Sequence, residues 1–344
     1  MLVQIVFAVL AISLTPFASA ANNPVLQADK TSKDSEKSQQ ITFYQDCLLR
    51  AAMTESSHTT LEQIRQSCKM LSAAQTEPLK PLEKRRLNEV ATQSNPFVIT
   101  PHKLNYAMFT HFTSGIHKRP FEEDAGKPLE YRDQEMQFQL SFKIPLITQM
   151  HFLGKELDIY GAYTNRSFWQ LFDDEDSIPF RETNHEPELW AQMHTDIDFF
   201  DFNLHTVSLG VNHQSNGQSN ALSRGWNRLF LQAKMQHDNS TLNFKTWARF
   251  DEQDEFDNSF NYTKYLGDFE IEAAHRDGDN TYALTLRNSY KWNQYGAVKF
   301  EFTHPLTKRL KGYIQYFNGY GDSLIELEHR SEKVGFGIVL VDRF

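Results

Sequence analysis

Two side chains near residue 214 have the types and the spacing of a base and the nucleophile that it activates. His213 and Ser215 follow residues 204–212, a segment in which apolar and polar residues alternate as they do in a β-strand. Side chains two residues apart on a strand point to the same side of the sheet, so the imidazole and the hydroxyl are neighbours. This arrangement suits nucleophilic catalysis by a serine.

A third member of the site is predicted from the next segment. Residues 226–236 alternate again, and Asn227 shares its parity with Leu229 and Leu231. If the two segments form a hairpin, Asn227 stands beside His213 and can orient its ring. The residues therefore predict a Ser-His-Asn triad, which is defined by roles and not by chain order.

The face that carries this candidate triad is apolar. Val211 and Leu229 lie on it, whereas Arg228 and Gln232 face the other way. In a soluble β-sandwich an apolar face would form the core, and a buried triad could not meet its substrate. In a membrane barrel the apolar face contacts lipid, and a neutral Asn suits that setting because an unpaired carboxylate in hydrocarbon is costly. The pattern favours a lipid substrate.

On its own a His-x-Ser pair is a weak signal, because polar residues at a strand end are ordinary loop material. His213 can also be interpreted as a structural histidine, whose loss would lower stability and not turnover. The residues alone leave both interpretations open.

The segments that must position these residues are predicted to be strands. Residues 136–144 alternate between apolar and polar side chains, and residues 241–250 do the same. We expect twelve strands, near residues 103–113, 134–145, 155–168, 187–199, 203–213, 226–236, 241–250, 263–275, 280–290, 296–303, 308–318 and 334–344. The number is even and each length approaches the ~9–11 residues of a tilted membrane-spanning strand.

Composition restricts the class of protein. The chain has 344 residues, a net charge of -9, 27 Phe, 13 Tyr and 5 Trp. A mean hydropathy of -0.56 is too low for a bundle of membrane helices, but it is compatible with a barrel whose strands alternate. The aromatic content suits interfacial girdles, and the negative charge gives no support to nucleic-acid binding.

The N-terminal part has a different character. Residues 1–20 are predicted to be a signal peptide, because an apolar run ends in the small residues Ala18-Ser19-Ala20. Residues 21–94 are predicted to be a polar and partly helical periplasmic segment, in which Cys47 and Cys68 are expected to form a disulfide. Residues 95–344 are predicted to form the barrel, and an aromatic end at Phe344 is typical of outer membrane barrels.

Three stretches resemble one known family. They are residues 213–227, with His213, Ser215, Gly217, Ser223 and Asn227 in order, residues 176–187 (DSIPFRETNHEP) and residues 319–325 (GYGDSLI). Together they cover about residues 95–344 and are similar to the outer membrane phospholipase A family. The resemblance implies an all-β, 12-stranded antiparallel transmembrane barrel of the bacterial outer membrane. It also implies a calcium-dependent phospholipase A1/A2, with lysophospholipase activity, that is active as a homodimer.

The resemblance also implies a role for each site residue. His213 is the base, Ser215 the nucleophile and Asn227 the residue that orients the histidine, while the backbone N–H of Gly217 is an oxyanion donor. One Ca²⁺ per active site is implied at the dimer interface, where a water that it holds is the other oxyanion donor. The implied calcium ligands are the carbonyl of Gln218, the hydroxyl of Ser223 and the carbonyl of Ser177 of the partner subunit.

Two positions depart from the family pattern. Gln218 stands where the family usually has Arg, although the ligand there is a main-chain oxygen. Asn220 stands where the family usually has Asp, which puts a second calcium site in doubt. The acidic runs at 173–176 and 251–257 are interpreted as solvated loops. Asn165 is expected to lie inward or at mid-barrel and to contact the other subunit.

Two rival classes are weighed against this prediction. A barrel without catalysis, such as a small porin or an adhesin, has no need of His, Ser and Asn on its apolar face. A soluble β-sandwich esterase is disfavoured by the terminal aromatic strand and by the lack of a Gly-x-Ser-x-Gly motif in the sequence.

Overall fold

The computed structural model describes most of the chain from residue 80 onward and a few residues before it. The described residues are 44–45, 47–49, 61, 64–65, 68, 80–92, 99–172, 180–250, 260–291, 293–307, 310–341 and 343. The chain divides into two compact units, Met1–Pro78 and Leu79–Phe344. In the first unit a disulfide joins Cys47 and Cys68. The predictions for residues 1–20, Ser177 and Phe344 lie outside the described residues.

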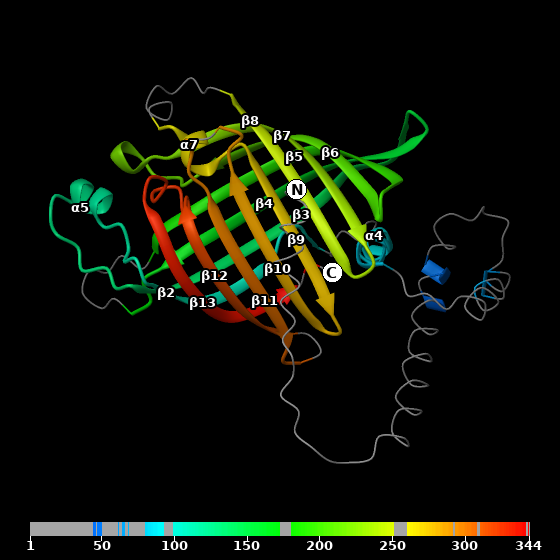
Figure 1. Ribbon diagram of the computed structural model, residues 1–344, viewed down its shortest axis with the longest axis horizontal. Helices are drawn as coiled ribbons and strands as arrows, with labels where there is room; N and C mark the ends of the chain where they lie inside the picture. Colours follow the sequence, from blue (N-terminus) through cyan, green and yellow to red (C-terminus); the bar gives the residue numbers. More distant parts are fainter. Residues whose placement is uncertain are drawn as a thin grey trace, which may run out of the picture. The chain divides into compact units, whose positions relative to one another are not determined.

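Twelve antiparallel strands of the second unit close into a barrel (Figure 1). They are β2 (Asn105–Phe112), β3 (Gln134–Phe152), β4 (Lys155–Trp169), β5 (Phe180–Phe199), β6 (Phe202–Ser215), β7 (Gly225–His237), β8 (Ser240–Phe250), β9 (Phe269–Asp277), β10 (Asn280–Asn288), β11 (Ala297–Pro305), β12 (Lys311–Tyr320) and β13 (Arg330–Val341). Strand β2 pairs with β3 on one side and with β13 on the other, so the ring has no open edge. The short strand β1 (Thr100–Pro101) adds to β3. Closure satisfies the backbone groups that lipid cannot, and the prediction of a 12-stranded barrel is confirmed.

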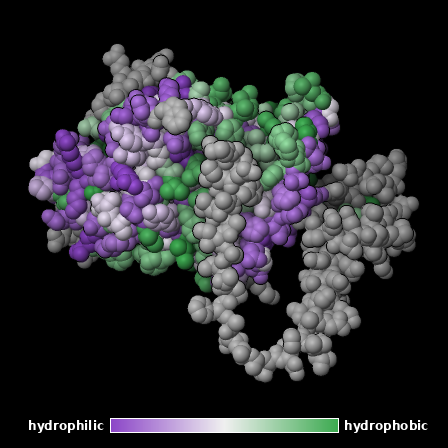
Figure 2. All heavy atoms as spheres, viewed as in Figure 1, coloured by the Kyte–Doolittle hydropathy of each residue, from purple (hydrophilic) through white to green (hydrophobic). Residues whose placement is uncertain are grey.

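The alternation of side chains places apolar residues on the outside of the barrel. On β7, Leu229 and Leu231 are 47% and 48% exposed, whereas Arg228 and Phe230 are 8% and 3% exposed. Figure 2 shows hydrophobic residues on the outer surface of the strands and hydrophilic residues gathered at the end that carries helix α5 (Arg119–Ala125). An exposed apolar belt of this extent is foreign to the surface of a soluble monomer.

An inward-folded segment occupies part of the lumen. The segment between β12 and β13 folds inward, where the backbone N–H of Leu324 donates to Asn184 and that of Ile325 donates to Glu182. Asp322 of the same segment pairs with Lys333. Among the described residues, a polar cavity of about 320 Å³ lies inside the barrel. This filling counts against the porin alternative.

One predicted strand begins too early. The segment predicted at 263–275 starts with helix α7 (Tyr262–Leu266), and β9 begins only at Phe269. Asn261 caps the helix by accepting a hydrogen bond from the backbone N–H of Lys264, which satisfies a donor that has no partner within the helix. Two other predicted strands are longer in the structure, because β3 continues to Phe152 and β5 begins at Phe180.

Helix α4 (Pro81–Thr92) lies at the barrel end opposite α5 and α7 (Figure 1). Arg86 pairs with Glu156 at 2.6 Å, and Glu89 pairs with Lys143 at 2.7 Å. The backbone N–H of Leu82 donates to Gln236. Residues 81–92, which belong to the segment predicted to be polar and partly helical, therefore form a helix fixed to the barrel. No helix among the described residues is both long enough and apolar enough to cross a membrane.

Acidification is expected to loosen helix α4. Burial alone would raise the pKa of Glu89, but Lys143 and Arg85 outweigh it and hold that pKa at about 2 instead of 4.5. A carboxylate with a depressed pKa stabilises the fold above pH 4.5, and this contribution is lost as the pH falls toward 2. Hydrogen exchange of α4 should therefore rise, after correction for intrinsic rates, between pH 5 and pH 2.5. The variant Glu89→Gln should exchange fast at both values, whereas Glu123→Gln, in an exposed ion pair of α5, should behave like the wild type.

Candidate active site on the outer face

His213 and Asn227 form the predicted pair across the β6–β7 hairpin. They are directly opposite each other in the strand register, and His213 Nδ1 lies 2.9 Å from Asn227 Oδ1. An amide oxygen only accepts hydrogen bonds, so Nδ1 of the imidazole carries the proton and donates it. The Nε2 lone pair is then the basic site of the ring.

Ser215 is the last residue of β6 and lies on the same face as His213. This face points out of the barrel, because Val211 and Leu229 on it are exposed whereas Asn212 on the other parity is buried. Both His213 and Ser215 are partly exposed. The candidate nucleophile therefore lies where the apolar outer surface gives way to the loops at the α5 end.

The loop after Ser215 is organised by Asn216, which the sequence analysis did not single out. Its buried side chain accepts from the backbone N–H groups of Gln218 (3.2 Å) and Arg224 (3.0 Å), and it donates to the carbonyl of Leu222 (2.8 Å). Gly217 has a φ of +63°, a conformation that side-chain-bearing residues adopt at a cost. An Asn that bonds to nearby backbone is a common turn device, and only this general preference could have indicated it.

Arg224 holds the far side of the same loop. Its guanidinium donates to the carbonyls of Ala221 (2.9 Å) and Ser223 (2.7 Å) and lies 3.7 Å above the centre of the Phe260 ring. Ser223, a predicted calcium ligand, is thus fixed through its backbone. Asn220 belongs to the short helix η1 (Asn220–Leu222) between these anchors.

Aromatic packing inside the barrel supports the hairpin from behind. Trp226, which is fully buried, stacks on Tyr262 with ring centres 5.3 Å apart, and its indole N–H donates to Gln214. The hydroxyl of Tyr262 accepts from the backbone N–H of Gly225 at 3.0 Å. Helix α7, which the sequence analysis took for a strand, therefore fixes the strand end next to the candidate triad.

A second imidazole stands beside Ser215 on β5. His185 is directly opposite Ser215 in the β5–β6 register, and its Nδ1 lies 2.6 Å from the hydroxyl of Tyr163 on β4. Asn165 on β4 is directly opposite His185 on β5 and, on its other side, opposite the exposed Leu140 on β3. Asn165 therefore lies on the outer face of the barrel and not in the interior. The sequence spacing did not indicate His185, because its proximity to Ser215 depends on the register of the long β5–β6 hairpin.

The predicted metal ligands are brought together only in part. Gln218 and Ser223 lie in one loop, which Asn216 and Arg224 brace at its two ends, and they offer a carbonyl and a hydroxyl. Oxygen donors of this kind suit a hard cation such as Ca²⁺. The third predicted ligand, Ser177, lies outside the described residues.

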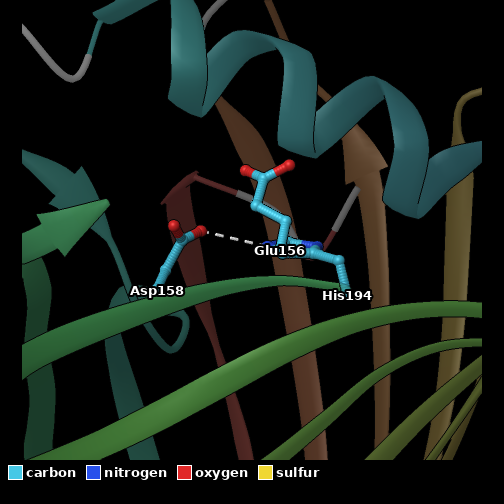
Figure 3. A group of neighbouring side chains, drawn as sticks. All are labelled: Glu156, Asp158 and His194. Atoms are coloured by element: carbon cyan, nitrogen blue, oxygen red, sulfur yellow. Dashed lines mark hydrogen bonds and ion pairs between the residues drawn. The ribbon is translucent and has the colours of Figure 1, made fainter. Parts of the chain in front are cut away.

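A different cluster of potential metal ligands lies beneath helix α4 (Figure 3). Glu156 pairs there with Arg86 of α4, and Asp158 accepts from His194 at 3.0 Å and from the backbone N–H of Gln149 at 2.9 Å. His194 is nine residues along β5 from His185, toward the opposite barrel end. An arginine already neutralises one carboxylate, so we interpret the cluster as a polar anchor for α4.

Comparison with known proteins places this arrangement in context. The family model for phospholipase A1 matches residues 82–340. The phospholipase A1 of Proteus vulgaris is 36% identical over 258 residues, which cover 75% of this chain and 86% of that protein. The Escherichia coli K12 enzyme is 35% identical over 263 residues, with the same two coverages of 75% and 86%.

Solved structures agree with the sequence comparison. Outer membrane phospholipase A from Escherichia coli superimposes with a TM-score of 0.66 at 32% identity, covering 72% of this chain and 100% of that one. The Salmonella typhi outer membrane phospholipase, a dimer with bound calcium, superimposes with a TM-score of 0.67 at 32% identity and covers 73% of this chain and 96% of that one. An Escherichia coli active-site variant, in which an asparagine is replaced by alanine, has a TM-score of 0.66 at 32% identity and covers 73% of this chain and 94% of that one.

Proposed function

The chain belongs to the phospholipase A1 family, and we propose that it carries out the reaction with Ser215, His213 and Asn227. It is a calcium-dependent phospholipase of the bacterial outer membrane that hydrolyses acyl ester bonds of phospholipids and acts as a homodimer. The observation that carries the proposed triad is the His213–Asn227 hydrogen bond, which is made on the outer, lipid-facing surface of the barrel.

The proposed chemistry is acyl transfer in two steps. Ser215 Oγ attacks the ester carbonyl carbon while its proton passes to Nε2 of His213. The C–O bond to the glycerol oxygen then breaks, and that oxygen takes the proton from His213, which leaves an acyl ester on Ser215. A water molecule attacks this ester, again with His213 as base, and releases the fatty acid and the free serine.

Asn227 has an orienting role in this scheme. Its carbonyl oxygen holds the proton of the imidazole on Nδ1, so Nε2 is ready to accept a proton from Ser215. When His213 becomes an imidazolium, the same oxygen remains a suitable acceptor. A neutral partner also avoids placing a carboxylate beside the hydrocarbon of the membrane.

The negative charge that develops on the carbonyl oxygen needs donors. We assign one of them to the backbone N–H of Gly217, whose left-handed conformation lets the loop turn directly after Ser215. The carbonyl of Gln218 and the hydroxyl of Ser223 are the proposed calcium ligands, with the carbonyl of Ser177 from the partner subunit completing the set. When bound, Ca²⁺ supplies positive charge and a polarised water beside this oxygen.

The proposed ligand set fits the two departures from the family pattern. A main-chain oxygen at 218 is unaffected by the side chain, so Gln218 should serve as well as Arg. Asn220 lacks the charge that a second site would use, so we propose one calcium ion per active site.

We further propose that residues 1–20 are a signal peptide, as N-terminal sequencing of the mature protein would test, and that residues 21–94 are periplasmic.

Fatty-acid release by the refolded protein tests the proposed function. Wild-type protein in mixed micelles of phosphatidylethanolamine and detergent should release fatty acid with millimolar calcium and should stop when a chelator is added. Folding is checked by the heat-dependent shift in gel mobility that closed barrels give. A well-folded barrel that releases no fatty acid at any calcium concentration would contradict the function, and a non-catalytic barrel would then be the better account.

A further inference from the structure

Ser215 is flanked by two imidazoles, and the triad uses only one of them. His213 precedes it by two residues on β6, and His185 faces it across the β5–β6 pair. Directly opposite residues on antiparallel strands have Cβ atoms about 4.5–5.5 Å apart, within reach of a long side chain. Both rings are on the outer face of the barrel.

The His185 ring is fixed in a defined orientation. Its Nδ1 lies 2.6 Å from the hydroxyl of Tyr163, and the two ring centres are 6.1 Å apart. When the phenol donates to Nδ1, the ring proton is on Nε2. The structure gives Nε2 no hydrogen-bond partner among the residues that it describes, so this N–H is available to a ligand.

The Nε2 edge of the ring lies against the loop that carries the proposed oxyanion donor. A Cβ atom built on Gly217 would be 3.4 Å from Cδ2 and 3.5 Å from Nε2 of His185. The ring edge of His185 therefore lies close to the backbone of Gly217, two residues after Ser215. A donor at this position would add to the Gly217 N–H and the calcium-held water that the proposed function already places beside the developing oxyanion.

We propose that His185 is a catalytic residue whose Nε2–H donates a hydrogen bond to the carbonyl oxygen of the scissile ester. The inference rests on the proposed function, in which Ser215 attacks that carbonyl. His185 transfers no proton, so the balance of the reaction is unchanged, and Tyr163 is a positioning residue that keeps the proton on Nε2. This hydrogen bond strengthens as the carbonyl oxygen becomes negative. It therefore lowers the activation barrier of acyl transfer more than it strengthens substrate binding.

The proposal gives the two imidazoles opposite tautomers and therefore different tasks. Asn227 Oδ1 can only accept, so it takes the proton of His213 Nδ1 and leaves Nε2 as a base. The hydroxyl of Tyr163 can donate to Nδ1 of His185, and we assign it that direction, which leaves Nε2 as a donor. A base at His185 would need the reverse arrangement. A phosphate of the lipid headgroup is another acceptor for the same N–H, and the experiment below separates the two acceptors.

The test compares two substitutions that differ only in the donor. His185→Phe keeps a ring without a donor, and His185→Gln places an amide N–H near the former Nε2. We expect kcat to fall on the order of 10²-fold in His185→Phe with KM nearly unchanged, and His185→Gln to recover most of the loss. Tyr163→Phe should give a smaller loss of kcat. His275→Phe is the matched control, because exposed His275 makes a similar Nδ1 contact to the hydroxyl of Ser240 (2.9 Å) far from the site.

A phosphate-free substrate identifies the acceptor. The fall in kcat for His185→Phe should be equal with phosphatidylethanolamine and with a monoacylglycerol. A loss confined to KM, or to the phosphate-bearing substrate, would overturn the inference in favour of headgroup binding. A kcat for His185→Phe within twofold of wild type would also overturn it, as would a His185→Gln variant no better than the Phe variant.

Parallel assays of Ser215→Ala and His213→Ala keep this result separate from the proposed function. If both variants are inactive while His185→Phe is fully active, only the role of His185 is wrong. If Ser215→Ala retains wild-type activity, the proposed triad is wrong and the inference is overturned with it.

Discussion

Replacing Ser215 with Ala is expected to lower the rate of fatty-acid release by at least ~10³-fold, and His213→Ala is expected to do the same. Ser215 supplies the atom that bonds to the acyl group, and His213 takes the proton that makes this atom nucleophilic. The two side chains act as a unit, so the double variant should be about as slow as either single one. Initial rates in mixed micelles at saturating calcium measure the effect.

A second serine–histidine pair on the barrel serves as the control. Ser240 and His275 are hydrogen-bonded at 2.9 Å but lie on β8 and β9, away from the candidate site. Ser240→Ala and His275→Ala should retain wild-type rates and the folded gel mobility. If Ser215→Ala kept more than a tenth of the wild-type rate while it remained folded, Ser215 would not be the nucleophile.

Removal of the Ser223 hydroxyl is expected to raise the calcium concentration needed for half-maximal activity at least ~10-fold. The hydroxyl is a proposed ligand, and the carbonyl of Gln218 alone from this subunit would bind the ion weakly. Arg224 holds the backbone of this loop, so Ser223→Ala should leave the loop in place. Calcium titrations of the rate, together with calorimetric titration of the dimer, measure the shift.

The side chain at 218 gives the matched comparison for this prediction. Gln218→Ala keeps the proposed main-chain ligand and should titrate like the wild type, because no step in the scheme uses its amide group. Equal calcium dependence in Ser223→Ala and wild type would remove Ser223 from the ligand set. A large shift in Gln218→Ala would instead mean that the side chain, and not the carbonyl, contacts the ion.

The strands of the barrel could be predicted from sequence because their signal is local. On β7 the lipid-facing Leu229 and the lumen-facing Arg228 are adjacent residues. Apolar residues that face lipid and polar residues that face the lumen therefore alternate along each strand. The same parity placed His213 and Ser215 together, and hairpin register added Asn227. These predictions needed contacts only within one strand or across the short connection between β6 and β7.

Local patterns failed where a contact joins distant parts of the chain. His185 lies opposite Ser215 only because 29 intervening residues return β6 to β5 in one particular register. Helix α7 was predicted to be the start of a strand, because apolar residues at Tyr262 and Leu266 are compatible with a helix or a strand. The helix is selected by packing of these side chains in the cluster that contains Trp226. The filling of the lumen by Leu324 and Ile325 likewise depends on acceptors on β5.

Detection of the acyl-enzyme is the most direct test of the account. Wild-type protein is mixed with a phospholipid of one defined acyl chain and calcium, quenched in acid within the first turnover and analysed by peptide mass spectrometry. We predict that the peptide containing Ser215 gains the mass of that acyl group, that the adduct is on Ser215, and that it fails to form in His213→Ala or with a chelator. An acyl group on another residue, or fatty-acid release at the full rate with no adduct on Ser215, would contradict the account.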